Sequence, residues 1–246
     1  MNEYLSTILP LYSMQLFYST SIQSAIITLD ENDSKHAIRV LRLKENDSID
    51  VIDGNGSLYH CSILDAHPKK CTLTVIEQKK ESNPYQQLHI AVAPTKNNNR
   101  YEWFLEKATE IGIGSVTPIV TDNSERKVIK HDRMEKIIVA AMKQSLKLYL
   151  PELKEVRSFK DVLQMHPEAN RLIAHCADDL DKIKLMDSID IRKNTFLLIG
   201  PEGDFSSKEI EMAKQKGFQS VSLGSARLRT ETAAIVACTQ LNLSYD

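Results

Sequence analysis

The chain has 246 residues, of which 42% are hydrophobic and 26% charged, and its formal net charge is −2 at pH 7. This composition is typical of a folded protein with a substantial core, and 8 glycines and 8 prolines are too few for a collagen-like or disordered chain. The longest apolar runs, such as residues 137–142, are far shorter than the roughly 20 residues of a membrane helix. No Lys or Arg precedes Lys35, so we expect no secretory signal.

The first part of the chain, from Met14 to about Lys80, has a mostly β pattern. Strands are predicted at residues 48–53, 58–66 and 71–77, and Asp53-Gly54-Asn55-Gly56 predicts a hairpin turn. A short helix at about residues 34–41 interrupts them. Several short strands with tight turns favour a small barrel over residues 14–82. A polar stretch with a proline at 79–84 predicts the domain boundary, and residues 1–13 are predicted to be an N-terminal extension outside both domains.

After the boundary, over residues 83–246, strands alternate with helices. Strands are predicted at 88–93, 115–120, 172–176, 196–199 and 221–223. Helices are predicted at 98–111, 132–148, 207–216 and 231–243. This alternation predicts an α/β domain with a parallel sheet, and in such sheets ligands bind at the carboxyl ends of the strands.

Cysteines and histidines give no metal site. Cys61, Cys71, Cys176 and Cys238 form no C-x-x-C pair, and no Cys/His cluster has zinc spacing. We therefore expect no bound metal. Scattered cysteines in a chain of this size predict buried, reduced thiols and a cytoplasmic protein.

The densest motif is Ile199-Gly200-Pro201-Glu202-Gly203-Asp204-Phe205-Ser206, which follows an apolar strand. Its two glycines allow close backbone approach, its proline fixes the chain path, and a capping box from Ser206 to Glu209 starts the next helix. A ligand could therefore meet backbone groups at this strand end, although a strand–helix connection without a ligand is an equally good interpretation. The loop has no Walker pattern, and no Gly-x-Gly-x-x-Gly occurs in the chain.

A second motif, residues 223–234, also runs from a strand end into a helix. Thr230 is a predicted N-cap, and Glu231 suits the positive end of the helix dipole. Arg227 and Arg229 are not needed for capping, and they could grip a phosphate, a carboxylate or an electron-rich base. The alternative is that they pair with surface carboxylates. Two such loops after separate strands favour a shared pocket.

Two basic stretches could contact nucleic acid. His36, Arg39 and Arg42 are spaced by three along a predicted helical face, which suits phosphate contacts, although a charged solvated face is an equally good interpretation. Residues 126–147 hold seven Lys or Arg against two acidic residues. Late in that stretch, Lys143-Gln144-Ser145 is either functional or simply faces outward.

Together these motifs closely resemble those of the RsmE family, which are SPOUT-class 16S ribosomal RNA (uracil-N3)-methyltransferases. The resemblance extends from Met14 nearly to the end and includes Glu106-Lys107-Ala108-Thr109-Glu110-Ile111-Gly112. It implies a PUA-like RNA-binding barrel followed by a SPOUT α/β domain with a C-terminal trefoil knot. It also implies a homodimer that methylates N3 of a specific uridine, uridine 1498, in the small subunit.

The resemblance implies S-adenosylmethionine as the cofactor. By motif match, the implied cofactor-binding residues are His175, Ile199, Gly200, Pro201, Glu202, Gly203, Leu223, Gly224, Ser225, Leu228 and Arg229. The implied RNA contacts are His36, Arg39, Arg42, Lys143 and Gln144. Two related functions stay open: methylation of a ribose 2′-hydroxyl by a similar SPOUT enzyme, and a non-catalytic RNA-binding assembly protein.

The expected chemistry assigns roles to three residues of the second motif. Uridine N3 carries a proton at neutral pH, and negative charge spreads onto the flanking carbonyl oxygens when that proton leaves. Arg229 or Arg227 could donate to such an oxygen, an effect worth about 3 kcal/mol in comparable anion holes. Glu231 is the candidate general base, although it could serve only the helix terminus.

Overall fold

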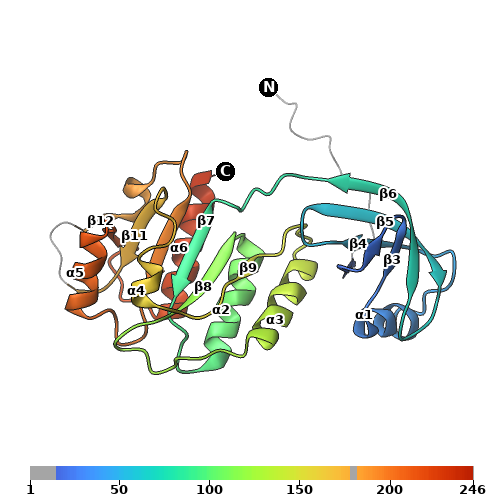
Figure 1. The fold of residues 1–246 in the computed structure, drawn as a ribbon, viewed down its shortest axis with the longest axis horizontal. Helices are drawn as coiled ribbons and strands as arrows, with labels where there is room; N and C mark the ends of the chain where they lie inside the picture. Colours follow the sequence, from blue (N-terminus) through green and yellow to red (C-terminus); the bar gives the residue numbers. More distant parts are fainter. Residues whose placement is uncertain (1–14, 178–181, 246) are drawn as a thin grey trace. The chain divides into compact units, whose positions relative to one another are not determined.

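The computed structural model describes residues 15–177 and 182–245, which form two compact units (Figure 1). The first unit comprises residues up to Asn83 together with Met142–Leu150, and the second comprises Pro84–Ala141 and the chain from Pro151 onward. The sequence did not predict that residues 142–150 belong to the first unit. They belong to it because Met142 is fully buried in a small apolar cluster with Leu16 and Ile52. The predicted extension, residues 1–13, lies outside the described residues.

A six-stranded sheet in the order β1-β4-β5-β6-β3-β2 builds the first unit. Its one parallel pairing is β1 with β4, and the others are antiparallel. Phe17, Ile27, Val51 and Leu73 form part of its core. The strands are β1 (Leu16–Tyr18), β2 (Ile22–Gln23), β3 (Ile26–Thr28), β4 (Ser48–Ile52), β5 (Ser57–Asp65) and β6 (Thr72–Lys80). The predicted β-rich first domain is therefore confirmed.

The helix of the first unit begins earlier than predicted. The Asp30 side chain accepts a hydrogen bond from Asp33 N and caps α1 (Glu31–Lys35), and the chain continues as one π-helical turn, η1 (His36–Val40). A π turn is wider than an α turn, so a spacing of three no longer keeps residues on one face. Arg42 lies beyond the helix with a φ of 59°, and it does not extend the predicted helical face.

The second unit contains a sheet in the order β10-β8-β7-β13-β11-β14-β12, with β9 also paired to β8. Its pairings are all parallel, which confirms the predicted parallel α/β domain. The strands are β7 (Leu88–Val92), β8 (Ser115–Val120), β9 (Glu152–Leu153), β10 (Arg157–Ser158), β11 (Asn170–Ala174), β12 (Ile183–Lys184), β13 (Thr195–Ile199) and β14 (Gln219–Ser222).

Its helices mostly match the predicted ones. The match is closest for α2, which ends at Gly112, where a φ of 126° stops the helix. The predicted capping box of α5 is present, but α3 ends at Gln144, earlier than predicted. The helices are α2 (Asn98–Ile111), α3 (His131–Gln144), α4 (Phe159–Val162), the 3₁₀ turn η2 (Leu185–Ser188), α5 (Ser207–Gln215) and α6 (Thr230–Tyr245).

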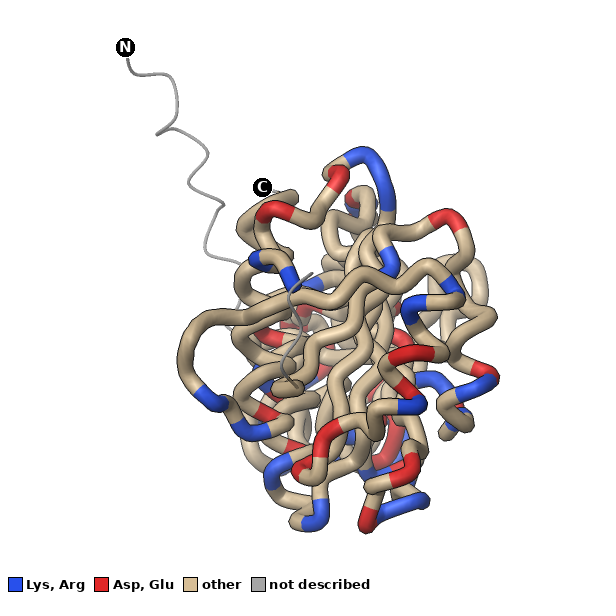
Figure 2. The backbone as a smooth tube through the Cα atoms, turned by 90° about the vertical axis from the view of Figure 1, so that its left-hand side faces the viewer, with Lys and Arg blue, Asp and Glu red and all other residues tan. Residues whose placement is uncertain are grey.

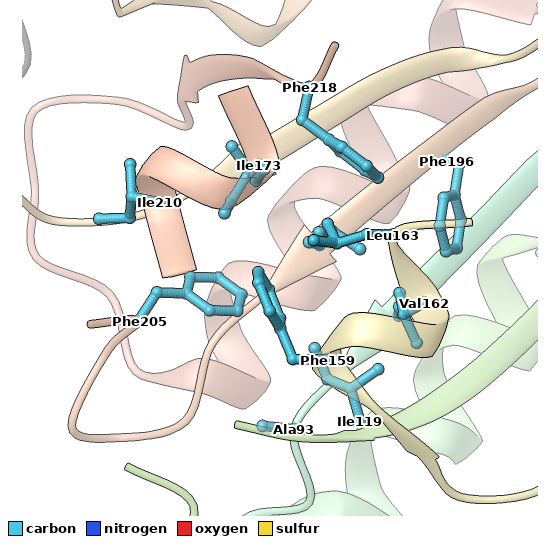
Figure 3. Close-up of a cluster of buried hydrophobic side chains, with 13 residues drawn as sticks. Ala93, Ile119, Phe159, Val162, Leu163, Ile173, Phe196, Phe205, Ile210 and Phe218 are labelled. Atoms are coloured by element: carbon cyan, nitrogen blue, oxygen red, sulfur yellow. The ribbon is translucent and has the colours of Figure 1, made fainter. Parts of the chain in front are cut away.

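The core of this unit lies on both faces of the sheet. Figure 3 shows Phe196 of β13 with side chains from α4 and α5, among them Phe159, Val162 and Ile210. Side chains alternate along a strand, so the buried Leu197 points to the opposite face, where α6 contacts β7 and β13. The sheet is therefore covered on both faces, as its continuous apolar strands require.

Charged residues of both signs occur throughout the chain. Figure 2 shows Lys and Arg interspersed with Asp and Glu along the tube, which agrees with the net charge of −2. Among the described residues, no helix is both long and apolar enough to cross a membrane.

Candidate active site

A cavity of about 830 Å³ lies in the second unit where β11, β13 and β14 end. This is the edge of a parallel sheet at which ligands bind. The predicted second strand-end loop, after β14, supplies a large share of the wall. The cavity is lined by residues 174–177, 182, 199–202, 204, 221–230 and 233.

The structure brings most of the predicted cofactor-binding residues to this one cavity. Those in its wall are His175, Ile199, Gly200, Pro201, Glu202, Leu223, Gly224, Ser225, Leu228 and Arg229. Gly203 does not line the cavity. A Cβ at Gly203 would lie 3.1 Å from the Cβ of Asn123, and the Asn123 side chain donates to the Gly203 carbonyl. Gly203 therefore allows a close approach between two loops.

The loop after β13 is anchored at both ends. A Cβ at Gly200 would lie 3.1 Å from the Phe205 ring, and that ring packs 5.5 Å from Phe159 in the core (Figure 3). The hydroxyl of Thr230 donates to the Gly200 carbonyl at 3.0 Å. Thr230 was predicted to be an N-cap, but it is the first residue of α6, and its hydroxyl joins the two motif loops instead.

Neighbouring loops brace the same region, and sequence patterns did not identify them. The backbone N–H of Lys96 donates to the Glu202 carboxylate at 3.0 Å. Arg126 holds that segment in turn, because its guanidinium donates to the carbonyls of Thr95 and Lys96 at 3.1 and 2.8 Å. The wall of the cavity is therefore positioned by β7 and β8 loops that contribute nothing to its lining.

Arg227 and Arg229 both line the cavity and are exposed. Among the residues that the structure describes, none forms an ion pair with either guanidinium. Gly224, at the start of their loop, has a φ of 134°, a conformation that favours glycine. The loop therefore presents two uncommitted cations to whatever occupies the cavity.

Glu231 lies close to this loop but outside the lining of the cavity. It is only 6% exposed, and its Oε1 is 3.6 Å from Nε of Arg100, in the first turn of α2. Its Oε2 is buried and has no hydrogen-bond partner among the described residues. Arg100 was not singled out from the sequence. Its Glu231 contact depends on α2 packing against α6, which no local pattern reveals.

The lining combines both charges with apolar surface. Lys182 and the two arginines are positive, whereas Glu202 and Asp204 are negative. The buried His175 ring shares a hydrogen bond with Ser220 Oγ at 3.0 Å. The apolar part of the lining includes Ala174, Ile199, Val221, Leu223, Leu228 and Ala233.

Cysteine exposure differs from the prediction at one position. Cys61, Cys71 and Cys238 are buried, but Cys176 is exposed. Burial raises the pKa of the Cys61 thiol to about 12 and that of Cys71 to about 11, with nearby carboxylates adding to both shifts. Cys176 lies two residues beyond the end of β11 and lines the cavity, which explains its exposure.

The predicted RNA-binding residues of the first unit fall into two groups. Arg39, Arg42 and Gln144 are exposed. Lys143 instead donates to both Asp33 oxygens, at 2.6 and 2.8 Å, and lies 5.8 Å from the centre of the Phe17 ring. His36 is half-buried and hydrogen-bonds the Gln15 side chain.

One group of side chains on α3 could in principle hold a metal ion. Ligand atoms of His131, Asp132 and Glu135 lie within 4.8 Å of one another. The sequence predicted no metal site, and the spacing of this group was not recognised from it. His131 is already 3.1 Å from the Leu153 carbonyl, and the two acidic residues are exposed. Their closeness therefore follows from helical spacing.

The chain matches two known family models. One, described as an RNA methyltransferase domain, covers residues 81–242, and the other, described as an RNA methyltransferase PUA domain, covers residues 29–76. Ribosomal RNA small subunit methyltransferase E of Synechocystis sp. is 30% identical over 228 residues, which are 90% of this chain and 74% of that protein. The chain belongs to the ribosomal RNA small subunit methyltransferase E family.

Solved structures agree with this membership of the RsmE family. A probable rRNA-methyltransferase from Porphyromonas gingivalis is 39% identical, with a TM-score of 0.87 over 94% of this chain and 100% of the other. A putative methyltransferase from Legionella pneumophila, in complex with the bound cofactor SAM, is 27% identical, with a TM-score of 0.81 over 93% and 97%. The resemblance expected from the motifs is therefore confirmed, and the first unit is a PUA domain.

Proposed function

We propose that this protein transfers a methyl group from S-adenosylmethionine to N3 of a uridine in 16S ribosomal RNA, uridine 1498 by family resemblance. The observation that carries this proposal is the cavity that both motif loops line together, with two exposed arginines in its wall. Membership of the RsmE family supports an RNA substrate, and the solved relative with bound SAM supports the cofactor. Small ribosomal subunits are assembled in the cytoplasm, where we expect the protein to act.

The cavity suits S-adenosylmethionine in size and chemistry. Its volume of about 830 Å³ is within the range of small-molecule sites. The cofactor carries a carboxylate, an ammonium group and a sulfonium, and the lining offers both cationic and anionic side chains. Ile199, Val221 and Leu223 offer apolar surface for an adenine ring. When bound, the cofactor supplies an electrophilic methyl group.

The protein's own contribution is to make uridine N3 a nucleophile. Loss of the N3 proton places negative charge on the uracil O2 and O4 atoms. Arg227 and Arg229, unpaired in the described part of the chain, would donate to one of these oxygens. Such a positioned donor lowers a barrier by about 3 kcal/mol.

Glu231 is the candidate general base, but its buried position hinders direct proton transfer from the uridine. None of the described residues hydrogen-bonds its Oε2, but the atom is buried beside Arg100, so a proton could reach it only after local rearrangement. A second role is compatible with its position, namely orientation of the Arg100 guanidinium. Glu231→Gln separates them, because the amide keeps an acceptor for Arg100 but cannot take up a proton.

A homodimer is part of the proposal. Leu243 on α6 is 68% exposed and Trp103 on α2 is 43% exposed, although the two helices pack together. Exposed apolar side chains of this size on adjacent helices favour burial by a second copy. Light scattering after gel filtration would measure the mass, and Leu243→Glu would be expected to yield monomers.

The test is transfer of labelled methyl from S-adenosylmethionine to hypomethylated small subunits, with naked 16S RNA in parallel and nucleoside analysis of the product. Label in 3-methyluridine supports the proposal. Label on a ribose 2′-oxygen overturns the N3 assignment and favours the related SPOUT reaction. No transfer and no cofactor binding would favour a non-catalytic assembly protein.

Cys176 provides an independent probe of cofactor binding. Among the four cysteines it alone is exposed, and it lines the cavity. Bound S-adenosylmethionine should therefore slow thiol labelling by a maleimide, with half-protection at a concentration near its Kd. The Cys176→Ser variant, which retains only buried thiols, is the control for labelling elsewhere.

A further inference from the structure

Asp204 has an unusual backbone conformation at the edge of the cavity. Its φ is 61°, in the left-handed region that favours glycine over residues with a Cβ. The conformation is fixed from outside the loop, because the Asn123 side chain donates to the Asp204 carbonyl at 3.0 Å and to that of Gly203 at 3.1 Å. Asp is one of the few residues besides glycine that adopt this region readily, because its short side chain can hydrogen-bond the nearby backbone.

The Asp204 carboxylate makes such a hydrogen bond across the cavity wall. Its Oδ2 accepts from the backbone N–H of Cys176 at 2.7 Å, and its Oδ1 accepts from Phe205 N at 2.8 Å. Cys176 belongs to the segment after β11, whereas Asp204 belongs to the loop after β13. Strand pairing between β11 and β13 ends at Ala174 and Ile199. The carboxylate therefore continues the link between these two walls beyond the sheet.

A second charged side chain holds the same segment. The Lys182 Nζ donates to the carbonyl of His175 at 2.9 Å and to that of Ala177 at 2.8 Å. The Lys182 ammonium group thus binds the carbonyls of His175 and Ala177, and the Asp204 carboxylate binds the N–H of Cys176 between them. Hydrogen bonds with an ionised partner are shorter and stronger than neutral ones. The pairing of β11 with β13 and β14 ends at Ala174, and beyond it these two charged groups hydrogen-bond the backbone of residues 175–177.

We propose that Asp204 is a positioning residue that holds residues 175–177 as a preformed third wall of the cofactor cavity. This inference rests on the proposed function, since the ligand is S-adenosylmethionine. In this proposal Asp204 acts through the Cys176 backbone, since each of its oxygens accepts a bond from a backbone N–H group; a direct effect of its charge on the ligand is the alternative that the test separates. Without the link, ligand binding would have to order this segment first, which weakens affinity.

The experiment compares Asp204→Gly and Asp204→Asn with the unmodified protein. Glycine accepts the left-handed backbone, so Asp204→Gly removes the link without adding strain. Asparagine places its NH₂ group opposite one of the two N–H donors and loses that bond. Asn46→Gly is the matched control, because Asn46 also has a positive φ, 71°, and lies in the first unit away from the cavity.

Two readouts test the proposal separately. Hydrogen–deuterium exchange of the peptide that ends at Ala177 is measured without ligand, and Asp204→Gly should exchange the Cys176 amide about tenfold faster. Calorimetry with S-adenosylmethionine and with S-adenosylhomocysteine should show Kd raised about tenfold for both ligands in Asp204→Gly. Asp204→Asn should lie between, and Asn46→Gly should change neither.

The outcomes distinguish this inference from the proposed function. Unchanged exchange and unchanged Kd in both Asp204 variants would overturn it. A loss of affinity confined to S-adenosylmethionine would also overturn it, because only that ligand has the sulfonium charge that a direct electrostatic contact would need. If the unmodified protein binds neither ligand, the proposed function fails, whereas the exchange experiment still decides whether the link exists.

Discussion

Basic residues in two regions of the molecule have opposite environments. In the first unit, Lys143 is bound to both oxygens of Asp33 and lies over the Phe17 ring. At the cavity of the second unit, Arg227 and Arg229 are exposed, and no residue in the described part of the chain forms an ion pair with them. A partnered charge contributes to the fold, whereas an unpartnered one beside a cavity is available to a ligand. Residue type alone does not reveal this difference.

The largest effect is expected at the cavity arginines. Arg229→Ala and Arg227→Ala should each leave the fold intact, because the side chains are exposed, and at least one should lower turnover about 100-fold, as expected for loss of a charge-stabilising donor. Labelled-methyl transfer at saturating cofactor measures the effect. Arg192→Ala is the matched control, because Arg192 is 86% exposed and bound to Asp190. Full turnover in both cavity variants would rule out the proposed electrostatic role.

Long and strongly patterned elements could be predicted from the sequence. The bounds of α2 follow from its apolar spacing and from Gly112, and residues 115–120 form β8 as predicted. The two-residue and three-residue strands β1 to β3 were missed, because they are stabilised mainly by pairing with distant strands. The π turn η1 was also missed, since one extra residue in a helical turn has no signature in apolar periodicity.

The site shows a similar limit. The two loops of the cavity could be located because each has local turn chemistry at a strand end. The contacts of Asn123 and Arg126 could not, because they connect loops that only the sheet order brings together. Arg100 and Glu231 are likewise joined by helix packing. Local sequence therefore identifies where a ligand binds better than it identifies what holds the binding groups in place.

A buried histidine in the second unit predicts that folding stability depends on pH. His89 is stacked 4.3 Å from His166, and its Nδ1 lies 2.8 Å from Ser115 Oγ. Burial lowers the pKa of His89 to about 4, with the positive charges of His166 and Lys154 adding to the shift and Glu152 opposing it. The unfolded chain takes up this proton near pH ~6.5, so the neutral folded ring contributes its full stability above that pH.

Folding stability should therefore fall as the pH decreases from ~6.5 to ~4, by on the order of 2 kcal/mol for this residue. Urea unfolding across this range measures the change. His89→Phe keeps an aromatic ring against His166 and should flatten the pH dependence. His67→Gln is the control, since His67 is exposed. The same slope in the His89→Phe variant as in the unmodified protein would show that other groups cause the acid sensitivity.

Lys143 should behave as a structural residue rather than as an RNA contact. Lys143→Ala removes the Asp33 interaction and the contact with Phe17, and it should lower the free energy of unfolding by about 1 kcal/mol. Chemical denaturation measures this loss. Gln144→Ala, at the exposed neighbouring position, is the control and should leave stability unchanged. A normal unfolding free energy for Lys143→Ala would remove the contrast with the cavity arginines.

The smallest effect is expected at the exposed arginines of the first unit. Arg39→Ala and Arg42→Ala should keep the unfolding free energy of the parent, because the side chains are exposed. If each contacts an RNA phosphate, its loss should weaken binding severalfold and reduce the slope of log affinity against log salt by about 1. Binding to a small-subunit RNA fragment over a salt series measures both quantities. An unchanged salt slope together with unchanged affinity would mean that exposure and positive charge are not sufficient here, and that RNA is held by other residues.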